Sequence, residues 1–173
     1  MLGLVDGLLG IVTKIPYTEM IDPRTAKILA SLDPKADAKF APFIEAAKIE
    51  ALKHGVEYIG ISGHRTWKEQ NEIYKIGRTK PGRKVTNAKG GQSNHNFGIA
   101  VDFGVFQDGK YLDTYNPKLA SKVHQAVGKL ASVYGIEWGG SWKNFKDEPH
   151  FEIYTGLSMS KKRELYLKYN SVL

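Results

Sequence analysis

The pattern of apolar and polar positions predicts short strands separated by helices. Residues 56–62 and 99–103 are mostly apolar runs beside glycines, which is typical of buried strands. In residues 150–154 the even positions would share one face of a third strand. Helices are predicted over 22–31, 33–54, 66–76, 116–134 and 158–170, three of them opened by Asp-Pro or Asn-Pro. We expect Pro42 to break the second helix or to restart it before Phe43.

Helices packed against a small, mostly antiparallel sheet make an α+β unit. At 173 residues and 42% hydrophobic, the chain suits one domain with a sizeable core. No run of 18 apolar residues predicts a transmembrane span. Residues 1–12 are apolar, but they lack a basic start and include Asp6, so a packing or membrane-surface helix is favoured over a signal peptide. We expect residues 1–30 to be a segment of open role and residues 31–173 to form the single globular unit.

The charge and the cysteine content restrict the metal ligands and the binding partners that the protein could use. The absence of cysteine excludes disulfides and thiolate metal sites, and leaves the compartment open. The net charge of +7 permits nucleic acid, an anionic membrane or an acidic polymer as partner. Nucleic acid is disfavoured because no recognition motif accompanies the charge.

The basic residues concentrate in the loop 75–89. No acidic residue lies between Glu72 and Asp102, whereas six cations do: Lys75, Arg78, Lys80, Arg83, Lys84 and Lys89. Such a loop would raise the local concentration of a substrate that carries carboxylates. The alternative is a solvated loop whose charge is incidental, and the sequence leaves both open.

Three residues could form a metal centre. His95, Asp102 and His150 offer two imidazoles and one carboxylate, a zinc set that leaves a fourth position open for water. Asp147 could then serve as the general base that such chemistry needs. Histidines and acids at these spacings also arise by chance, so spacing alone leaves the role open.

The residues that flank the candidate metal ligands also form recognisable motifs. Around the candidate site the chain reads Ser93-x-His95-x-x-Gly98-x-Ala100-x-Asp102 and Asp147-x-Pro149-His150. Upstream lie Ser62-Gly63-His64-Arg65-Thr66, Glu69-Gln70, Gly77-Arg78-Thr79-Lys80-Pro81-Gly82 and Val85-Thr86-Asn87-Ala88. Over residues 36–156 this order resembles the D-alanyl-D-alanine carboxypeptidase and L-alanyl-D-glutamate peptidase family of zinc peptidoglycan hydrolases. The run 77–104 resembles the L-alanyl-D-glutamate endopeptidases of bacteriophage endolysins and their bacterial relatives.

The resemblance implies a fold of the hedgehog and DD-peptidase type with Zn²⁺ in a groove on the sheet. It implies that His95, Asp102 and His150 are the zinc ligands and that Asp147 is the general base. Arg65 matches the family arginine that steadies the substrate carbonyl as it becomes an oxyanion, which suits a permanently charged guanidinium. Ser93 would orient the site, and Trp138 and Trp142 would line the groove.

Each of these residues also has a plainer interpretation. Arg65 could be a surface ion-pair partner, Ser93 a turn serine and Trp138 a core residue. His64 stands where the family usually has Phe or Tyr, and we expect it to pack as an aromatic ring. The remaining candidates are expected to be bystanders or core residues: His54, His124, Glu137 and Glu148.

The leading hypothesis is a zinc-dependent endopeptidase that cleaves the L-Ala–D-Glu bond of peptidoglycan stem peptides. We expect a monomeric phage endolysin, held in the host cytoplasm until it is released to the cell wall. One alternative is a D-alanyl-D-alanine carboxypeptidase or dipeptidase, although those relatives usually carry Glu where this chain has Asp147. The other is a non-catalytic, zinc-containing wall-binding module.

Overall fold

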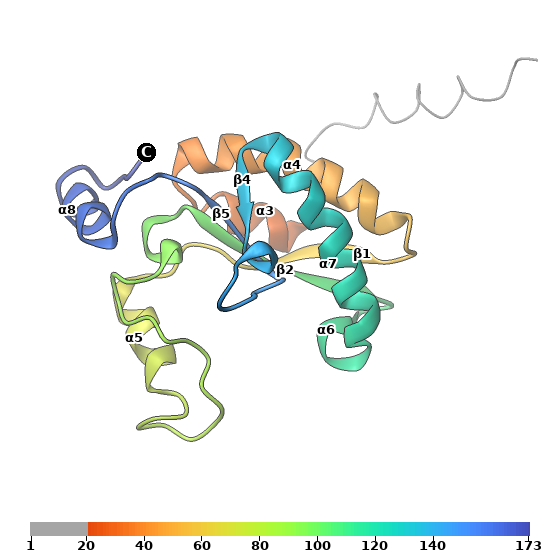
Figure 1. Cartoon of the computed structure of the whole chain (residues 1–173), viewed down its shortest axis with the longest axis horizontal. Helices are drawn as coiled ribbons and strands as arrows, with labels where there is room; N and C mark the ends of the chain where they lie inside the picture. Colours follow the sequence, from red (N-terminus) through yellow and green to blue (C-terminus); the bar gives the residue numbers. More distant parts are fainter. Residues whose placement is uncertain (1–20) are drawn as a thin grey trace, which may run out of the picture.

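The computed structural model describes residues 21–173, so the apolar run 1–12 lies outside the described residues. Its sheet contains β1 (Glu57–Ser62), β2 (Ala100–Gln107), β5 (His150–Ile153) and β4 (Ile136–Trp138) in that spatial order (Figure 1). The short β3 (Lys110–Tyr111) pairs with β2, and every pairing in the sheet is antiparallel. The predicted strands at 56–62, 99–103 and 150–154 are confirmed.

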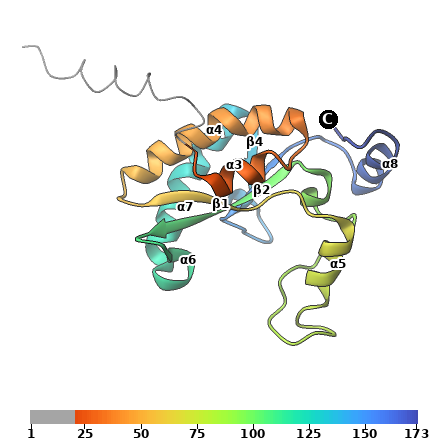
Figure 2. The same cartoon turned by 180° about the vertical axis from the view of Figure 1, so that it is seen from behind.

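The described part of the chain contains six α-helices. They are α3 (Pro23–Leu29), α4 (Pro34–Leu52), α5 (Trp67–Lys75), α6 (Leu112–Tyr115), α7 (Pro117–Ala131) and α8 (Met159–Tyr169). Helices α3, α4 and α7 pack on the sheet, whereas α5 and the loop after it extend away from it (Figures 1 and 2). The α+β expectation is therefore confirmed, and among the described residues no helix is both long and apolar enough to cross a membrane.

The prediction that Pro42 interrupts its helix is wrong. Helix α4 runs without a break from Pro34 to Leu52, with Pro42 inside it. Proline removes the hydrogen bond to the carbonyl four residues earlier, here that of Ala38. Both Pro42 and Ala38 are exposed, so this carbonyl can be solvated, while Phe40, Phe43 and Ile44 bury the opposite side of the helix. The packing of that side outweighs the lost bond.

The alternation of side chains along β2 and β5 separates the core from the site. Val101, Phe103 and Phe151 point to one face, where they are fully buried and pack with Phe43 of α4. Residues at the intervening positions, Asp102 among them, point to the other face. A one-residue slip would exchange the two sets, so burial of the aromatic rings fixes which residues face the cleft.

Two further features tie the helices to the sheet. The Gly60 N–H of β1 donates to Thr25 Oγ1 of α3 at 2.8 Å, so residues of the segment 1–30 that the structure describes pack onto the domain. His124 of α7 lies between the Tyr58 hydroxyl and the Asp113 carboxylate, at 2.8 Å from each. It is 1% exposed. His124 is thus a satisfied core histidine, as expected, and burial raises the pKa of Tyr58 well above its usual value.

Candidate active site

The sheet register brings two of the three candidate ligands together. Asp102 of β2 lies directly opposite His150 of β5 in the antiparallel ladder. His95 comes from a 3₁₀ turn, Asn94–Phe97, which ends at Gly98 with a φ of 66°. A Cβ at Gly98 would lie 2.7 Å from the backbone nitrogen of Asp33, so glycine meets both the conformational and the steric demand there.

The three side chains converge on one point. His95 Nε2 and His150 Nδ1 lie 3.2 Å and 2.9 Å from the same oxygen, Oδ1 of Asp102. The candidate ligand atoms of the three residues all lie within 4.8 Å of one another. Two imidazole nitrogens and a carboxylate oxygen are ligands that zinc prefers, and three protein ligands leave a position for substrate or water. The donor set therefore fits a catalytic zinc ion.

The outer nitrogen of each ring is also bonded. His95 Nδ1 donates to the Gly63 carbonyl at 2.8 Å, and His150 Nε2 lies 2.8 Å from Oε2 of Glu152. When the rings are neutral, as metal binding requires, these bonds leave His95 Nε2 and His150 Nδ1 to face the metal. The sequence interpretation missed Glu152, although its position two residues after His150 on a strand places it on the same face.

Burial, charge and hydrogen bonds shift the pKa values of Asp102 and His150. Burial alone would raise the pKa of Asp102, but the charges and hydrogen bonds of His95 and His150 hold it well below its usual range. Burial would lower the pKa of His150, yet its bonds to Asp102 and Glu152 raise it to about 10. The site thus keeps a carboxylate ionised under buried conditions, as a cation site requires.

A cleft of about 700 Å³ opens in front of these residues. Its walls include Arg65, Ser93 and Asp147 together with the three candidate ligands. Trp142 and Phe145 also line it, and Phe145 is 65% exposed. The cleft therefore combines a polar floor with apolar side chains that an extended peptide could contact.

Asp147 is placed beside the cluster without belonging to it. Its backbone nitrogen donates to Gly139 O, and its own carbonyl accepts from the His150 N–H at 3.2 Å. Burial, followed by the negative charge of Asp102, raises the pKa of its carboxyl group. A carboxylate with a raised pKa at the edge of a metal cleft is suited to accept a proton.

Arg65 is fixed before any substrate arrives. Its Nη2 donates to Ser62 Oγ at 2.7 Å and its Nη1 to Gln70 Oε1 at 2.9 Å. Its backbone N–H donates to the His95 carbonyl at 3.0 Å, so the segment that carries Arg65 is tied to the segment that carries a candidate ligand. Gln70, which is fully buried, was quoted in a motif but assigned no role from the sequence.

The two tryptophans expected in the groove are separated. Trp142 lines the cleft, and its ring lies 5.1 Å from the ring of His150. Trp138 lines a different hollow, and its Nε1 donates to the Glu148 carbonyl at 2.8 Å. Trp138 packs against the core, and a Cβ on Gly128 or Gly140 would collide with its ring. Of the pair, Trp142 alone reaches the cleft.

The remaining candidates occupy supporting positions. Glu137 accepts from Trp142 Nε1 at 2.6 Å, and Glu148 accepts from Ser121 Oγ at 2.9 Å. We expected His64 to pack as an aromatic ring. It also makes a polar contact, because its Nε2 lies 3.2 Å from the Tyr166 hydroxyl. His54 makes no contact with the cleft.

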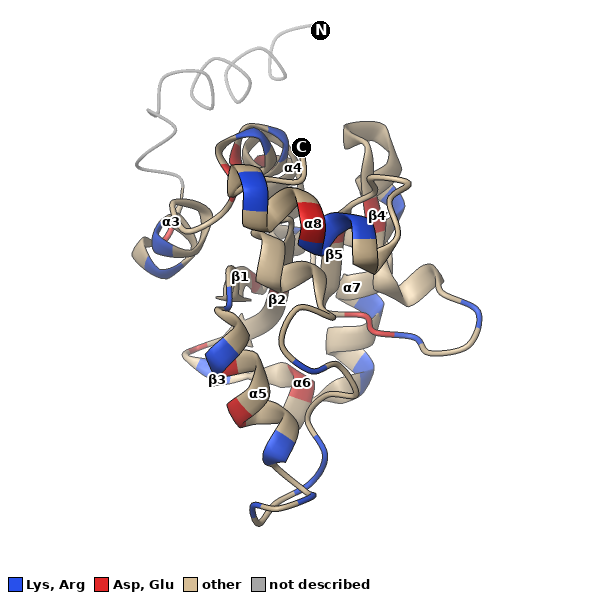
Figure 3. Ribbon diagram, turned by 90° about the vertical axis from the view of Figure 1, so that its left-hand side faces the viewer, with Lys and Arg blue, Asp and Glu red and all other residues tan. Residues whose placement is uncertain are grey.

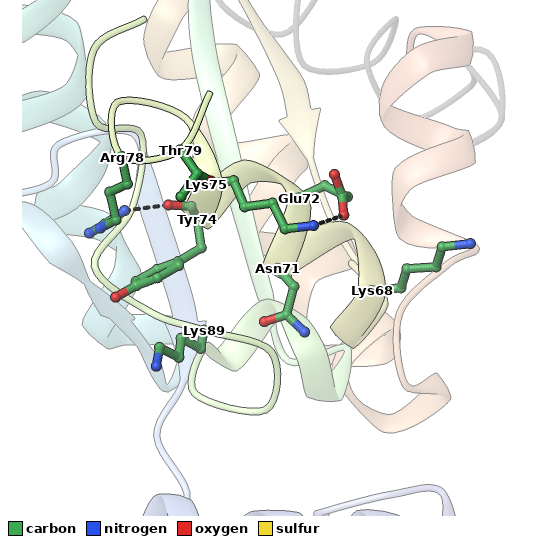
Figure 4. Close-up of a pocket in the computed structure, with 8 residues that line it drawn as sticks. All are labelled: Lys68, Asn71, Glu72, Tyr74, Lys75, Arg78, Thr79 and Lys89. Atoms are coloured by element: carbon green, nitrogen blue, oxygen red, sulfur yellow. Dashed lines mark hydrogen bonds and ion pairs between the residues drawn. The ribbon is translucent and has the colours of Figure 1, made fainter. Parts of the chain in front are cut away.

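Most cations of the basic loop are bonded within the protein. Lys75 and Lys80 both pair with Glu72, at 2.7 Å each. The Arg78 guanidinium stacks on Tyr74 at 3.7 Å and donates to carbonyl oxygens, including that of Thr86 at 3.0 Å. Glu72, Lys75 and Arg78 line a separate hollow. In it Lys68 points away from Arg78 and Lys89 (Figure 4). Lys84, by contrast, is exposed and lines the candidate active site.

An α+β fold that gathers two imidazoles and a carboxylate in an open cleft, with a further carboxylate beside them, is typical of a metallohydrolase. The chain matches the family model described as D-alanyl-D-alanine carboxypeptidase over residues 86–153. It is 41% identical over 116 residues to the peptidoglycan L-alanyl-D-glutamate endopeptidase CwlK of Bacillus subtilis, covering 63% of this chain and 68% of the relative. The chain belongs to this family of peptidoglycan peptidases, whose members are in general zinc-dependent.

Other relatives agree with this assignment. The chain is 36% identical over 96 residues to the L-alanyl-D-glutamate peptidase of Listeria phage A118, an alignment that covers 50% of this chain and 33% of that protein. The Serratia marcescens L-Ala D-Glu endopeptidase ChiX superposes with a TM-score of 0.50 at 24% identity, over 76% of this chain and 87% of that one. The LD-carboxypeptidase LdcB gives a TM-score of 0.53 at 20% identity, over 79% and 64%. At these identities the two structures establish the fold alone.

Proposed function

We propose that this protein is a zinc-dependent endopeptidase that cleaves the L-Ala–D-Glu bond of peptidoglycan stem peptides. The observation that carries the proposal is the convergence of His95 Nε2 and His150 Nδ1 on one oxygen of Asp102, in a cleft that also holds Asp147 and Arg65. The CwlK and phage A118 relatives bear this activity in their names. His95, Asp102 and His150 would hold the ion.

Zinc, Asp147 and Arg65 have separate roles in the proposed reaction. When bound, zinc supplies Lewis acidity and makes a water acidic near neutral pH. Asp147 accepts the proton of the attacking water and returns it to the amine that leaves. Arg65, already held by Ser62 and Gln70, donates to the carbonyl oxygen as negative charge develops on it. Because Arg65 is preorganised, little of its side-chain entropy remains to be lost on binding.

The proposed substrate carries a carboxylate that a cation at the cleft would bind. D-glutamate in a stem peptide keeps a free carboxylate next to the bond that is cut. Lys84 is exposed, lines the cleft and makes no bond within the described residues, so we assign it to this carboxylate. Arg78, another cation of the same loop, donates instead to the carbonyls of Tyr74 and Thr86.

We also infer a biological setting from the phage relative: an endolysin that acts on the wall after release from the host cytoplasm. The partner of the cleft would then be bacterial peptidoglycan. Asp147 in place of the glutamate usual in the D-alanyl-D-alanine dipeptidases favours the endopeptidase over the carboxypeptidase alternative.

The test is digestion of purified sacculi followed by mass spectrometry of the released muropeptides. We expect a new amino terminus on D-glutamate and muramyl-L-alanine left on the glycan, with no release by Asp147→Asn or by protein stripped of metal. Release of terminal D-alanine would replace the proposal with the carboxypeptidase. No new terminus from the zinc-loaded protein would favour the wall-binding module.

A further inference from the structure

Helix α8 carries a buried lysine that bonds to the turn bearing His95. Lys162 is the residue of α8 that is buried, at 5% exposure, whereas its neighbour Lys161 is exposed. Lysine is almost never buried without a partner, since its charged form loses solvation. The partner here is Asn94, whose Oδ1 accepts from Lys162 Nζ at 2.7 Å.

This contact is the first link of a chain that ends at a candidate zinc ligand. Asn94 and Glu152 line the same cleft. Burial would raise the pKa of Glu152, but His150, the Asn94 side chain and the charge of Lys162 lower it, so the Asn94 amide that accepts from Lys162 also lies beside this carboxylate. Glu152 in turn lies 2.8 Å from His150 Nε2. Four side chains thus connect α8 to the ring whose opposite nitrogen faces Asp102.

Other contacts hold α8 against the segment that bears His95. Arg163 Nη1 donates to the Gly91 carbonyl at 3.2 Å, and the Tyr166 ring packs edge-on against Phe97 at 5.5 Å. Met159 lines the candidate active site. Figure 3 views the molecule from the side on which α8, rich in Lys and Arg, lies. The helix begins beyond residue 153, where the match to the family model ends.

We propose that Lys162 is a positioning residue for the metal site: through Asn94 it holds the Glu152 carboxylate against His150 Nε2, which keeps His150 Nδ1 turned toward the metal position. The inference rests on the proposed function, because it requires His150 to be a zinc ligand. Partners in the outer shell of a metal site orient its ligands, and their loss typically costs roughly 10- to 100-fold in metal affinity or activity.

A purely structural role for Lys162 makes a different prediction. Lys162→Met leaves the buried Asn94 Oδ1 without its donor, which costs fold stability. If Lys162 only supports the fold, the variant melts earlier but its folded form binds zinc as tightly as the unchanged protein. If Lys162 positions His150, zinc affinity falls even though the protein remains folded.

The experiment measures the zinc dissociation constant by competition with a chromophoric chelator. The proteins are the unchanged chain, Lys162→Met and the control Lys161→Met, which removes an exposed lysine that pairs with Glu164 on the surface of the same helix. We expect zinc to bind about tenfold more weakly to Lys162→Met and with unchanged affinity to the control, each measured below the melting temperature of that variant. Asn94→Ala cuts the same chain at its next link and should give a comparable loss even if Lys162→Met does not fold.

The double variant Asn94→Ala/Lys162→Met shows whether Lys162 affects zinc binding through Asn94 or independently of it. Once Asn94 is gone, removal of Lys162 should cost little further zinc affinity, because the connection is already broken. Equal zinc affinity in Lys162→Met and the unchanged protein, or fully additive losses in the double variant, would overturn the inference. Failure of the unchanged protein to bind zinc would instead overturn the proposed function, and the inference with it.

Discussion

The guanidinium of Arg65 is fastened to the fully buried amide of Gln70, with Nη1 donating to Oε1 at 2.9 Å. The other end of this amide donates to the Ala88 carbonyl at 2.8 Å and to Thr86 Oγ1 at 3.3 Å. Thr86 and Ala88 form part of the cleft wall. One side chain of α5 therefore sets both the direction of Arg65 and the position of the wall near it.

This arrangement predicts that Gln70→Leu impairs turnover while zinc binding is retained. Leucine has a similar size but leaves Arg65 without its acceptor and the Ala88 carbonyl without its donor. Misplacement of a positioning group by about 1 Å costs on the order of 100-fold, so we expect kcat to fall by roughly 10- to 100-fold. Steady-state kinetics and metal analysis test this together. The control is Gln125→Leu, an exposed residue of α7. An unimpaired Gln70→Leu would show that Arg65 does not need this anchor.

The metal centre gives the second prediction. His95→Ala, Asp102→Ala and His150→Ala should each abolish binding of one zinc ion per chain, because each removes a ligand from a set of three. Metal analysis of the purified variants measures this, with His54→Ala as the control outside the cleft. Full zinc content in any one of the three would exclude that residue as a ligand.

The elements of this fold were predictable because their signals are local. The Thr66 and Glu69 side chains form the capping box that opens α5, and Gly55 and Gly135 adopt positive φ after α4 and after the turn that follows α7. The short β3, β4 and α6 were not predicted, and Pro42 was predicted wrongly. Its effect depends on which side of α4 faces the core, and tertiary packing decides that.

The candidate site was predictable in its ligands but not in its supports. His95, Asp102 and His150 carry recognisable residue types at family spacings. The contacts of Gln70, Asn94 and Lys162 join segments up to 68 residues apart, and no local pattern indicates such pairs. The same holds for Trp138 and Trp142, because which of two nearby tryptophans reaches the cleft depends on the turn at Gly139–Ser141.

The third prediction concerns the basic loop. Lys84→Met should raise KM with little change in kcat, because it removes a cation that binds a substrate carboxylate away from the reacting atoms. Lys80→Met is the matched control, since Lys80 pairs with Glu72 on a different hollow. The salt dependence of kcat/KM should weaken in Lys84→Met and persist in Lys80→Met. Equal effects of the two substitutions would assign the loop charge to a general, diffuse attraction.

The last prediction is that replacing Asp147 raises the stability of the protein and lowers its activity. Because burial and the charge of Asp102 raise its pKa, the folded protein binds this proton more tightly than the unfolded chain does. The resulting stabilisation is present below the unfolded pKa, near 3.8, and is lost as the pH rises through the raised folded value. At neutral pH the ionised carboxylate therefore costs stability. Asp147→Asn should raise the melting temperature of the metal-free protein at pH 7.

The same substitution should lower turnover by roughly two orders of magnitude or more while zinc is retained, because the general base is lost. In the unchanged enzyme kcat/KM should fall as the pH drops through the pKa of the Asp147 carboxyl group, because only the ionised form can accept a proton. Glu148→Gln, which alters a carboxylate bonded to Ser121, is the control and should retain turnover. Near-normal hydrolysis by Asp147→Asn would place the base on another residue, whereas a lower melting temperature would mean that Asp147 supports the fold instead of straining it.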